Sequence, residues 1–223
     1  MYNRKVMFDL PLFPLNTVLF PGMPLNLHIF EERYKRMIRI CLQTRQPFGV
    51  VLIKHGFESY GPVAKPHYIG CTARILESEP LSDGRMNIVA LGQKRFRILS
   101  LDYERAYLVG RVELYPLERS HPEFLEQKGK RLRPMIRRYM QILTEASEAN
   151  LDPRHLPHDP LVLAYLAAVL LQIPPEQKQK LLTSKHATDL LNDLLVVYRR
   201  ELALLRALLS GEARQSLGHF SVN

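Results

Sequence analysis

Apolar residues in the first half of the chain recur mostly with the two-residue period of β-strands. Residues 25–29 (LNLHI) alternate between apolar and polar, which predicts a half-buried strand. Residues 48–53 (FGVVLI) are apolar throughout and predict a strand buried on both faces. Further extended segments cover residues 69–81, 85–91, 94–103 and 108–117, and Ser82-Asp83-Gly84 is a hairpin signal between the first two. Short strands at this spacing indicate a barrel or a sandwich.

One helix interrupts these strands. Apolar residues at positions 34, 37, 38, 41 and 42 follow the spacing of a single helix face, which predicts a helix over residues 31–43. Glu31 and Glu32 suit the positive end of its dipole, and Glu31 is expected to cap it. Residues 56–66 are expected to form a loop.

The period changes at Ser120, after which the chain reads as helices. Ser120 to Glu123 has the form of a capping box, and the apolar spacing from Leu125 to Leu143 predicts a long amphipathic helix. A proline-rich connector over residues 151–160 leads to a helix over residues 161–172, which Asp159-Pro160 begins. A short helix over residues 176–182 follows, and the last helix is expected from about Thr188 to Ser210, with Gly211 ending it.

Strands followed by helices place the chain in the α+β class. We expect a β-barrel domain over residues 1–118 and a helical bundle over residues 119–223. The net charge of +9 permits nucleic-acid or acidic partners without showing either. Two cysteines cannot form a disulfide framework, the N-terminus has no signal-peptide pattern, and the most apolar stretch is too short to cross a bilayer. A cytoplasmic protein with no membrane contact is expected.

A longer pattern runs from residue 10 to residue 34, LPLFPLNTVLFPGMPLNLHIFEERY. It resembles the opening signature of the Lon N-terminal domain family. Residues 70–75 (GCTARI), 81–85 (LSDGR) and 92–98 (GQKRFRI) are similar to that family's glycine-led strand, hairpin and following strand. Cys71 departs from the pattern, because Lon proteins commonly have Thr there.

The resemblance implies a PUA-like β-barrel with one inserted helix, followed by a helical bundle that ends in a long helix. It also implies recognition of unfolded or tagged polypeptides. The chain has no phosphate loop, because Phe124 stands where the first Gly is required before Gly129-Lys130. We therefore expect a stand-alone binding module without ATPase or protease domains, with no catalytic residue, cofactor or metal.

The candidate binding residues of the barrel lie near the family signature: Met23, Phe30, Arg33 and Tyr34. They could present a peptide-binding surface, and apolar side chains at the barrel mouth and in the cleft between barrel and bundle would then cover the client residues. In the structural alternative, Phe30 and Tyr34 pack the helix on the barrel while Arg33 stays solvated.

A basic run in the second half supports an alternative function. Six cations and no acid lie between residues 127 and 138: Lys128, Lys130, Arg131, Arg133, Arg137 and Arg138. Such a face could bind RNA phosphates, with Arg133 and Arg137 as candidate contacts, although no paired aromatic residues form a stacking strand.

Other candidate sites have simpler explanations. His155, His158 and Asp159 have a spacing that could suit a metal, but no cysteine or third histidine lies nearby and the proline-rich connector explains their presence. Cys41 and Cys71 lie on apolar elements, as inert buried thiols do. The last helix carries a second apolar set, Leu190, Val197, Leu204 and Leu208. That set is either buried within the bundle or shared in a homodimer. An enzyme acting on a small molecule is a third class that the motifs do not exclude.

Overall fold

A computed structural model describes residues 6–56, 65–118, 121–146 and 153–218 of this chain. The chain forms two compact units. The barrel unit comprises Met1–Glu118 and Gln172–Lys185, and the helical unit comprises Arg119–Leu171 and His186–Asn223. The fold is therefore a barrel followed by helices, and the α+β class and the architecture expected from the sequence are confirmed.

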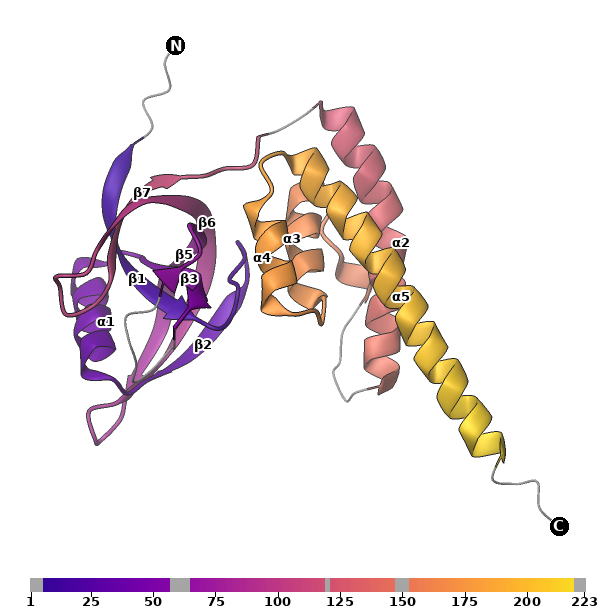
Figure 1. Ribbon diagram of the computed structural model, residues 1–223, viewed down its shortest axis with the longest axis horizontal. Coiled ribbons are helices and arrows are strands. Elements are labelled where there is room, and N and C mark those ends of the chain that lie inside the picture. The colour runs from indigo at the N-terminus through magenta and orange to yellow at the C-terminus, as the bar shows by residue number, and fades with distance from the viewer. Residues whose placement is uncertain (1–5, 57–64, 119–120, 147–152, 219–223) are drawn as a thin grey trace. The chain divides into compact units, whose positions relative to one another are not determined.

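The barrel unit contains seven strands and two helices among its described residues (Figure 1). They are β1 (Met7–Leu15), β2 (Pro24–Ile29), α1 (Glu32–Thr44), β3 (Phe48–His55), β4 (Lys65–Pro66), β5 (Ile69–Pro80), β6 (Met86–Asp102), β7 (Val109–Leu114) and α4 (Pro175–Thr183). The strand order is β1-β7-β6-β5-β3-β4, and β1 also pairs in parallel with β3, which closes the barrel. Among the described residues, β2 pairs with β6 alone.

Two apolar clusters fill this unit. The larger one joins β2, α1 and β3, and it contains the buried α1 residues Tyr34, Met37, Ile38 and Cys41. The smaller one surrounds Phe96 on β6. Glycines on two neighbouring strands make room for the Phe96 ring, since a Cβ at Gly49 or Gly70 would lie 2.8 or 2.7 Å from the Phe96 Cζ. Both clusters depend on residues from distant parts of the chain.

Several expectations about the strands need correction. Residues 85–91 and 94–103 belong to one strand, β6, which runs through Gly92 without ending. Lys65 and Pro66, expected in a loop, form β4 against β3, while residues 57–64 lie outside the described part. The sequence patterns predicted no strand over Met7–Leu15, which forms β1. Two prolines in this segment have no backbone N–H to donate to a neighbouring strand, so the segment did not look like a strand.

The inserted helix is confirmed with small changes. It spans Glu32–Thr44, and four of the five residues of the predicted face are buried, but Leu42 is exposed. Glu31 precedes the helix without a side-chain capping bond. Its carboxylate instead accepts a 2.8 Å hydrogen bond from Arg33 Nε. Glu31 therefore occupies the N-cap position as expected, but its carboxylate orients Arg33 and does not bond the helix amides.

Helix α4 packs on the outside of the barrel strands. The buried Arg95 donates from Nη1 to the carbonyls of Leu182 and Ser184, both at 2.8 Å, and from Nε to Tyr115 at 3.1 Å. Gln179 Nε2 donates to the carbonyl of Ile69 at 2.9 Å. These bonds tie the end of α4 to β6 and β5. Residues 172–185 thus belong to the barrel unit. The division into two domains at residue 118, which the sequence suggested, remains a prediction.

The helical unit contains α2 (Pro122–Ala146), a 3₁₀ turn at Pro153–His155, α3 (Pro160–Leu170) and α5 (Ala187–Gly218). Asp159 caps α3 as predicted, because its carboxylate accepts from the amides of Leu161 and Val162. Figure 1 shows α2 and α5 side by side, and the Tyr198 hydroxyl of α5 donates to the Ala167 carbonyl of α3 at 2.9 Å. Ser120 of the predicted capping box and the start of the connector, residues 151–152, lie outside the described part.

The last helix does not end at Gly211. Helix α5 continues to Gly218, because the residues after Gly211 include the good helix formers Glu212, Ala213, Arg214 and Gln215. A single interior glycine costs a helix only about 1 kcal/mol, which such neighbours offset. Of the second apolar set on α5, Leu190 is buried, Val197 is half-buried, and Leu204 and Leu208 are exposed. Dimerisation through this helix remains an expectation.

Candidate functional site

Tyr34 is an anchor of the barrel core. Its ring stacks on Phe13 with centroids 4.0 Å apart, and the Arg33 guanidinium lies 4.6 Å from the centre of the same ring. Tyr34 is buried and Arg33 is half-buried. The two residues therefore pack α1 on the barrel, as the structural alternative expected of Tyr34.

Phe30 behaves differently, because 43% of its surface is exposed. It follows the last residue of β2, and its ring stacks on His28 with centroids 6.2 Å apart. Beside it lies a narrow cleft of about 60 Å³ between β1, β2 and the start of α1. The cleft is lined by Phe13, Leu15, Leu27, His28, Ile29, Phe30, Glu31 and Tyr34. Phe30 thus stands exposed at the rim of an apolar cleft.

Met23 lies at the opposite end of β2. It is half-buried against the larger apolar cluster, and its carbonyl accepts a 2.9 Å hydrogen bond from the Gly92 amide. Gly92 also lies close to the preceding loop, since a Cβ there would be 2.2 Å from the Phe20 carbonyl oxygen. We call Met23, β2, Phe30 and the adjoining cleft the β2 surface.

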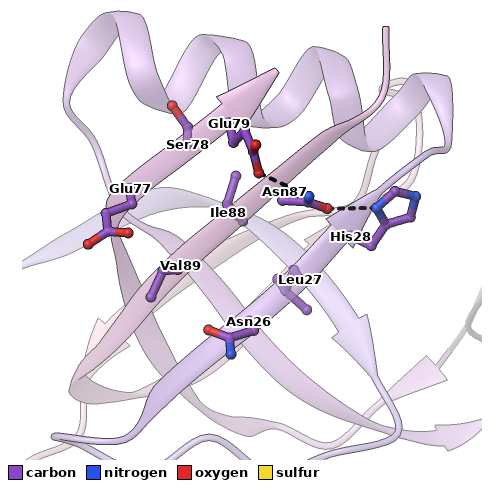
Figure 2. Close-up of a pocket in the computed structure, with 9 residues that line it drawn as sticks. All are labelled: Asn26, Leu27, His28, Glu77, Ser78, Glu79, Asn87, Ile88 and Val89. Atoms are coloured by element: carbon purple, nitrogen blue, oxygen red, sulfur yellow. Dashed lines mark hydrogen bonds between the residues drawn. The ribbon is translucent and has the colours of Figure 1, made fainter. Parts of the chain in front are cut away.

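A wider hollow of about 610 Å³ lies on the outer face of β2, β6 and β5. Figure 2 shows the His28, Asn87 and Glu79 side chains in one hydrogen-bonded row across these strands. At the end of the row, Arg85 Nη1 lies 3.5 Å from His28 Nε2. Arg85 also hydrogen bonds to Asp83, which lowers the pKa of that carboxyl to about 2. The charge of Arg85 is therefore already balanced within the hairpin.

The hollow was not identified from the sequence. The alternation in residues 25–29 does place Asn26 and His28 on one face of a strand, and the hairpin places Glu79 opposite Asn87. The pairing of β2 with β6, which brings these two sets together, joins residues about 60 positions apart. No local pattern specifies that pairing.

The other two predicted binding residues, Arg133 and Arg137, lie on α2 in the helical unit. Arg133 donates to the backbone carbonyls of Leu156 at 3.1 Å and Pro157 at 2.6 Å, and Lys128 donates to Asn192 at 2.5 Å. Arg137 is exposed, as are Arg131 and Arg138. The basic run is thus partly used within its own unit.

Both cysteines are buried. Burial raises the pKa of the Cys41 thiol to about 11 and is the largest cause of the rise at Cys71, to about 12. Within the described residues, no group of three or more His, Cys, Asp or Glu side chains could hold a metal ion. The side chains of His155, His158 and Asp159 therefore do not form such a group.

We expect iodoacetamide to leave both thiols unlabelled in the folded protein at about pH 8. At that pH a pKa of about 11 leaves a thiolate fraction about a hundredfold below that of an ordinary thiol, and burial also blocks the reagent. Mass spectrometry of the labelled protein measures the result, with the urea-unfolded chain as the control that labels at both positions. Fast labelling of either thiol in the folded state would contradict this result.

None of the described helices combines the length and the apolar character needed to span a bilayer.

Comparison with known proteins identifies the family. Residues 9–199 match the ATP-dependent protease La (LON) substrate-binding domain. Similar curated proteins include Lon protease 2 of Myxococcus xanthus, which is 27% identical over 88% of this chain and 24% of its own length. A LON peptidase N-terminal domain and RING finger protein of Schizosaccharomyces pombe is 26% identical over 84% of this chain and 44% of its own length. The chain thus spans about a quarter of the length of this Lon protease and of the similar Lon protease of Anaeromyxobacter dehalogenans.

Solved structures agree with this result. The Lon N-terminal domain protein from Xanthomonas campestris is 26% identical, with a TM-score of 0.62 over 85% of this chain and 98% of that structure. The N-terminal domain of the Mycobacterium avium complex Lon protease shares the fold, with a TM-score of 0.66 at 19% identity over 86% of this chain and 98% of that one. The chain belongs to the LON substrate-binding domain family.

Proposed function

We propose that this protein is a non-catalytic module that binds unfolded or tagged polypeptides through the β2 surface, and that it serves protein quality control in the cytoplasm. The observation that carries the proposal is the exposed Phe30 ring at the rim of an apolar cleft. The name of the family, a substrate-binding domain, supports a polypeptide partner.

The proposed mechanism is non-covalent burial of apolar side chains. Phe30 and the half-buried Met23 and Leu27 offer apolar surface that a client residue would cover. Burial of such surface contributes roughly 25 cal/mol per Å², and an aromatic ring adds a preference for stacking. The surface is small, so the expected dissociation constant is about micromolar, as for transient interfaces.

Two features favour binding over chemistry. The thiols of Cys41 and Cys71 are buried with raised pKa values, so neither supplies a reactive thiolate. Both thiols lie in the larger buried cluster, whereas the His28 side chain is exposed and is held in a polar row with Asn87 and Glu79. The two thiols therefore give no support to the alternative of an enzyme that acts on a small molecule.

The RNA-binding alternative has less support. Arg133 is committed to two backbone carbonyls and Lys128 to Asn192. The other four cations of the basic run are exposed, and they are Lys130, which lies 3.9 Å from Glu126, Arg131, Arg137 and Arg138. Fewer phosphate contacts mean weak affinity with a shallow salt dependence. Arg137 and Arg138 lie on α2 and are not part of the β2 surface. Charge reversal at these two positions should leave polypeptide binding unchanged.

A substitution at the cleft rim tests the proposal. We expect Phe30→Ser to weaken binding of a fluorescently labelled, reduced and carbamidomethylated model protein about tenfold, because the client loses its main apolar contact. Fluorescence anisotropy at moderate salt measures the affinity. Phe124→Ser is the matched control, since Phe124 is 56% exposed on α2 and its ring centroid lies 6.2 Å from that of a histidine, His121, the same distance as between Phe30 and His28. Equal affinity of wild type and Phe30→Ser, or an equal loss in both variants, would refute the proposed site.

A further inference from the structure

The hollow on the outer face of β2, β6 and β5 is lined by two glutamates on its β5 side, Glu77 and Glu79 (Figure 2). The strand register places its residues in two rows across the three strands. One row is His28, Asn87 and Glu79, and the other is Asn26, Val89 and Glu77. Each row thus begins with a polar residue on β2 and ends with a glutamate on β5.

The first row is fixed by hydrogen bonds. Asn87 Nδ2 donates to Glu79 Oε2 at 3.3 Å, so Asn87 Oδ1 is the acceptor for His28 Nδ1 at 2.8 Å. This arrangement uses one carboxylate oxygen of Glu79. In the described part of the chain, the other oxygen carries no hydrogen bond and Glu79 has no ion pair. Glu79 is thus held in place with its charge still available.

The second row supplies an apolar floor. Val89 is half-buried at the middle of the hollow, between Asn26 and Glu77. Glu77 is exposed, and within the described residues no cation pairs with it. The hollow therefore places an aliphatic surface directly beside two uncompensated carboxylates.

This local charge is opposite to that of the whole protein, which carries a net charge of +9. The nearby Arg85 does not neutralise the glutamates, because its guanidinium pairs with Asp83 at 2.5 Å. A side chain suited to the hollow has an aliphatic stem and a cationic end, as Lys and Arg have. Neighbouring strands lie about 4.8 Å apart, so a stem above Val89 on β6 can bring its cation to the glutamates on β5.

The hollow is continuous with the β2 surface, because Leu27 and His28 line both the hollow and the cleft beside Phe30. We propose that the hollow is a subsite for a Lys or Arg side chain of the polypeptide whose apolar residue occupies the cleft at Phe30. This inference rests on the proposed function and adds a preference to it. The preferred client segment then carries a basic residue close to an apolar one.

Three synthetic peptides of one extended sequence test the subsite with the full-length protein. Each carries the same apolar residues, followed by two Lys, two Gln or two Glu. We expect the Lys peptide to bind about fivefold tighter than the Gln peptide at low salt, with the Glu peptide weakest, and the difference to shrink at high salt. The double substitution Glu77→Gln/Glu79→Gln should remove the Lys preference and leave the affinity for the Gln peptide unchanged.

The control is Glu123→Gln/Glu145→Gln, which makes the same charge change at exposed positions on α2. This variant should keep the fivefold preference. Equal binding of the Lys and Gln peptides to wild type, or a preference that survives Glu77→Gln/Glu79→Gln, overturns the subsite and leaves polypeptide binding standing. If no peptide and no unfolded protein binds, the proposed function fails together with the subsite.

Discussion

Phe96→Ala should lower the free energy of unfolding by about 4 kcal/mol, the largest effect that we expect from a single substitution in this chain. Phe96 is fully buried in the smaller cluster of the barrel, among Leu10, Leu12 and Val112. The space for its ring exists because Gly49 and Gly70 have no Cβ. Strand backbones hold these glycines apart, so the cavity left by alanine cannot collapse.

Urea unfolding followed by circular dichroism measures this loss. Leu99→Ala is the control on the same strand, because Leu99 is 43% exposed and its truncation should cost well under 1 kcal/mol. A loss below about 1.5 kcal/mol for Phe96→Ala would show that the ring does not support the barrel as described.

Arg95→Met should destabilise the barrel unit by about 3 kcal/mol and release α4. Arg95 neighbours Phe96 on β6 and so points to the opposite side of the strand, where it donates to carbonyls of Tyr115, Leu182 and Ser184. Methionine keeps much of the stem but leaves those buried acceptors without their donor. The guanidinium charge also interacts favourably with the negative end of the α4 dipole, and the substitution removes that charge.

Hydrogen exchange measures the effect on α4 separately from global stability. The backbone amides of residues 176–183 should exchange faster in Arg95→Met. Arg95→Lys should restore only part of the protection, since one ammonium cannot reach all three carbonyls. Arg111→Met is the control, because Arg111 forms an exposed ion pair with Asp9. Unchanged exchange in α4 would mean that the Arg95 hydrogen bonds do not hold this helix.

The release of α4 bears on how the two units are connected. The Glu118 amide donates to the Lys185 carbonyl at 2.9 Å, at the two places where the chain leaves the barrel unit. The Glu118 and Lys185 side chains also form an ion pair at 3.4 Å. The Ser184 carbonyl, next to Lys185, accepts a hydrogen bond from Arg95. Loss of the Arg95 side chain should therefore loosen both segments at which the chain leaves the barrel unit.

The sequence predicts those parts of the fold that local patterns determine. The two-residue period identified β2, the apolar run identified β3, and the Ser82–Gly84 turn identified the hairpin, where Gly84 has a φ of +80°. The spacing of Tyr34, Met37, Ile38 and Cys41 identified α1. In each case, neighbouring residues alone decide the backbone conformation.

Long-range packing explains what the sequence did not predict. Strand β1 forms despite its prolines because β3 and β7 pair with it on its two sides. In the sequence, helix α4 looks like part of the bundle. In the structure it is held on the barrel by the Arg95–Leu182 and Gln179–Ile69 hydrogen bonds, which join residues about 90 to 110 positions apart. The Phe30 segment was identified by resemblance, whereas the exposure of Phe30 and the burial of Tyr34 required the structure.

Hydrogen exchange with and without a saturating unfolded polypeptide tests the proposed binding surface most directly. Slower exchange should appear in β2 and through Phe30 to Tyr34, with α2 and its exposed arginines unchanged. Protection confined to α2, or tight binding that leaves β2 exchanging at its free rate, would contradict recognition of polypeptides by the β2 surface.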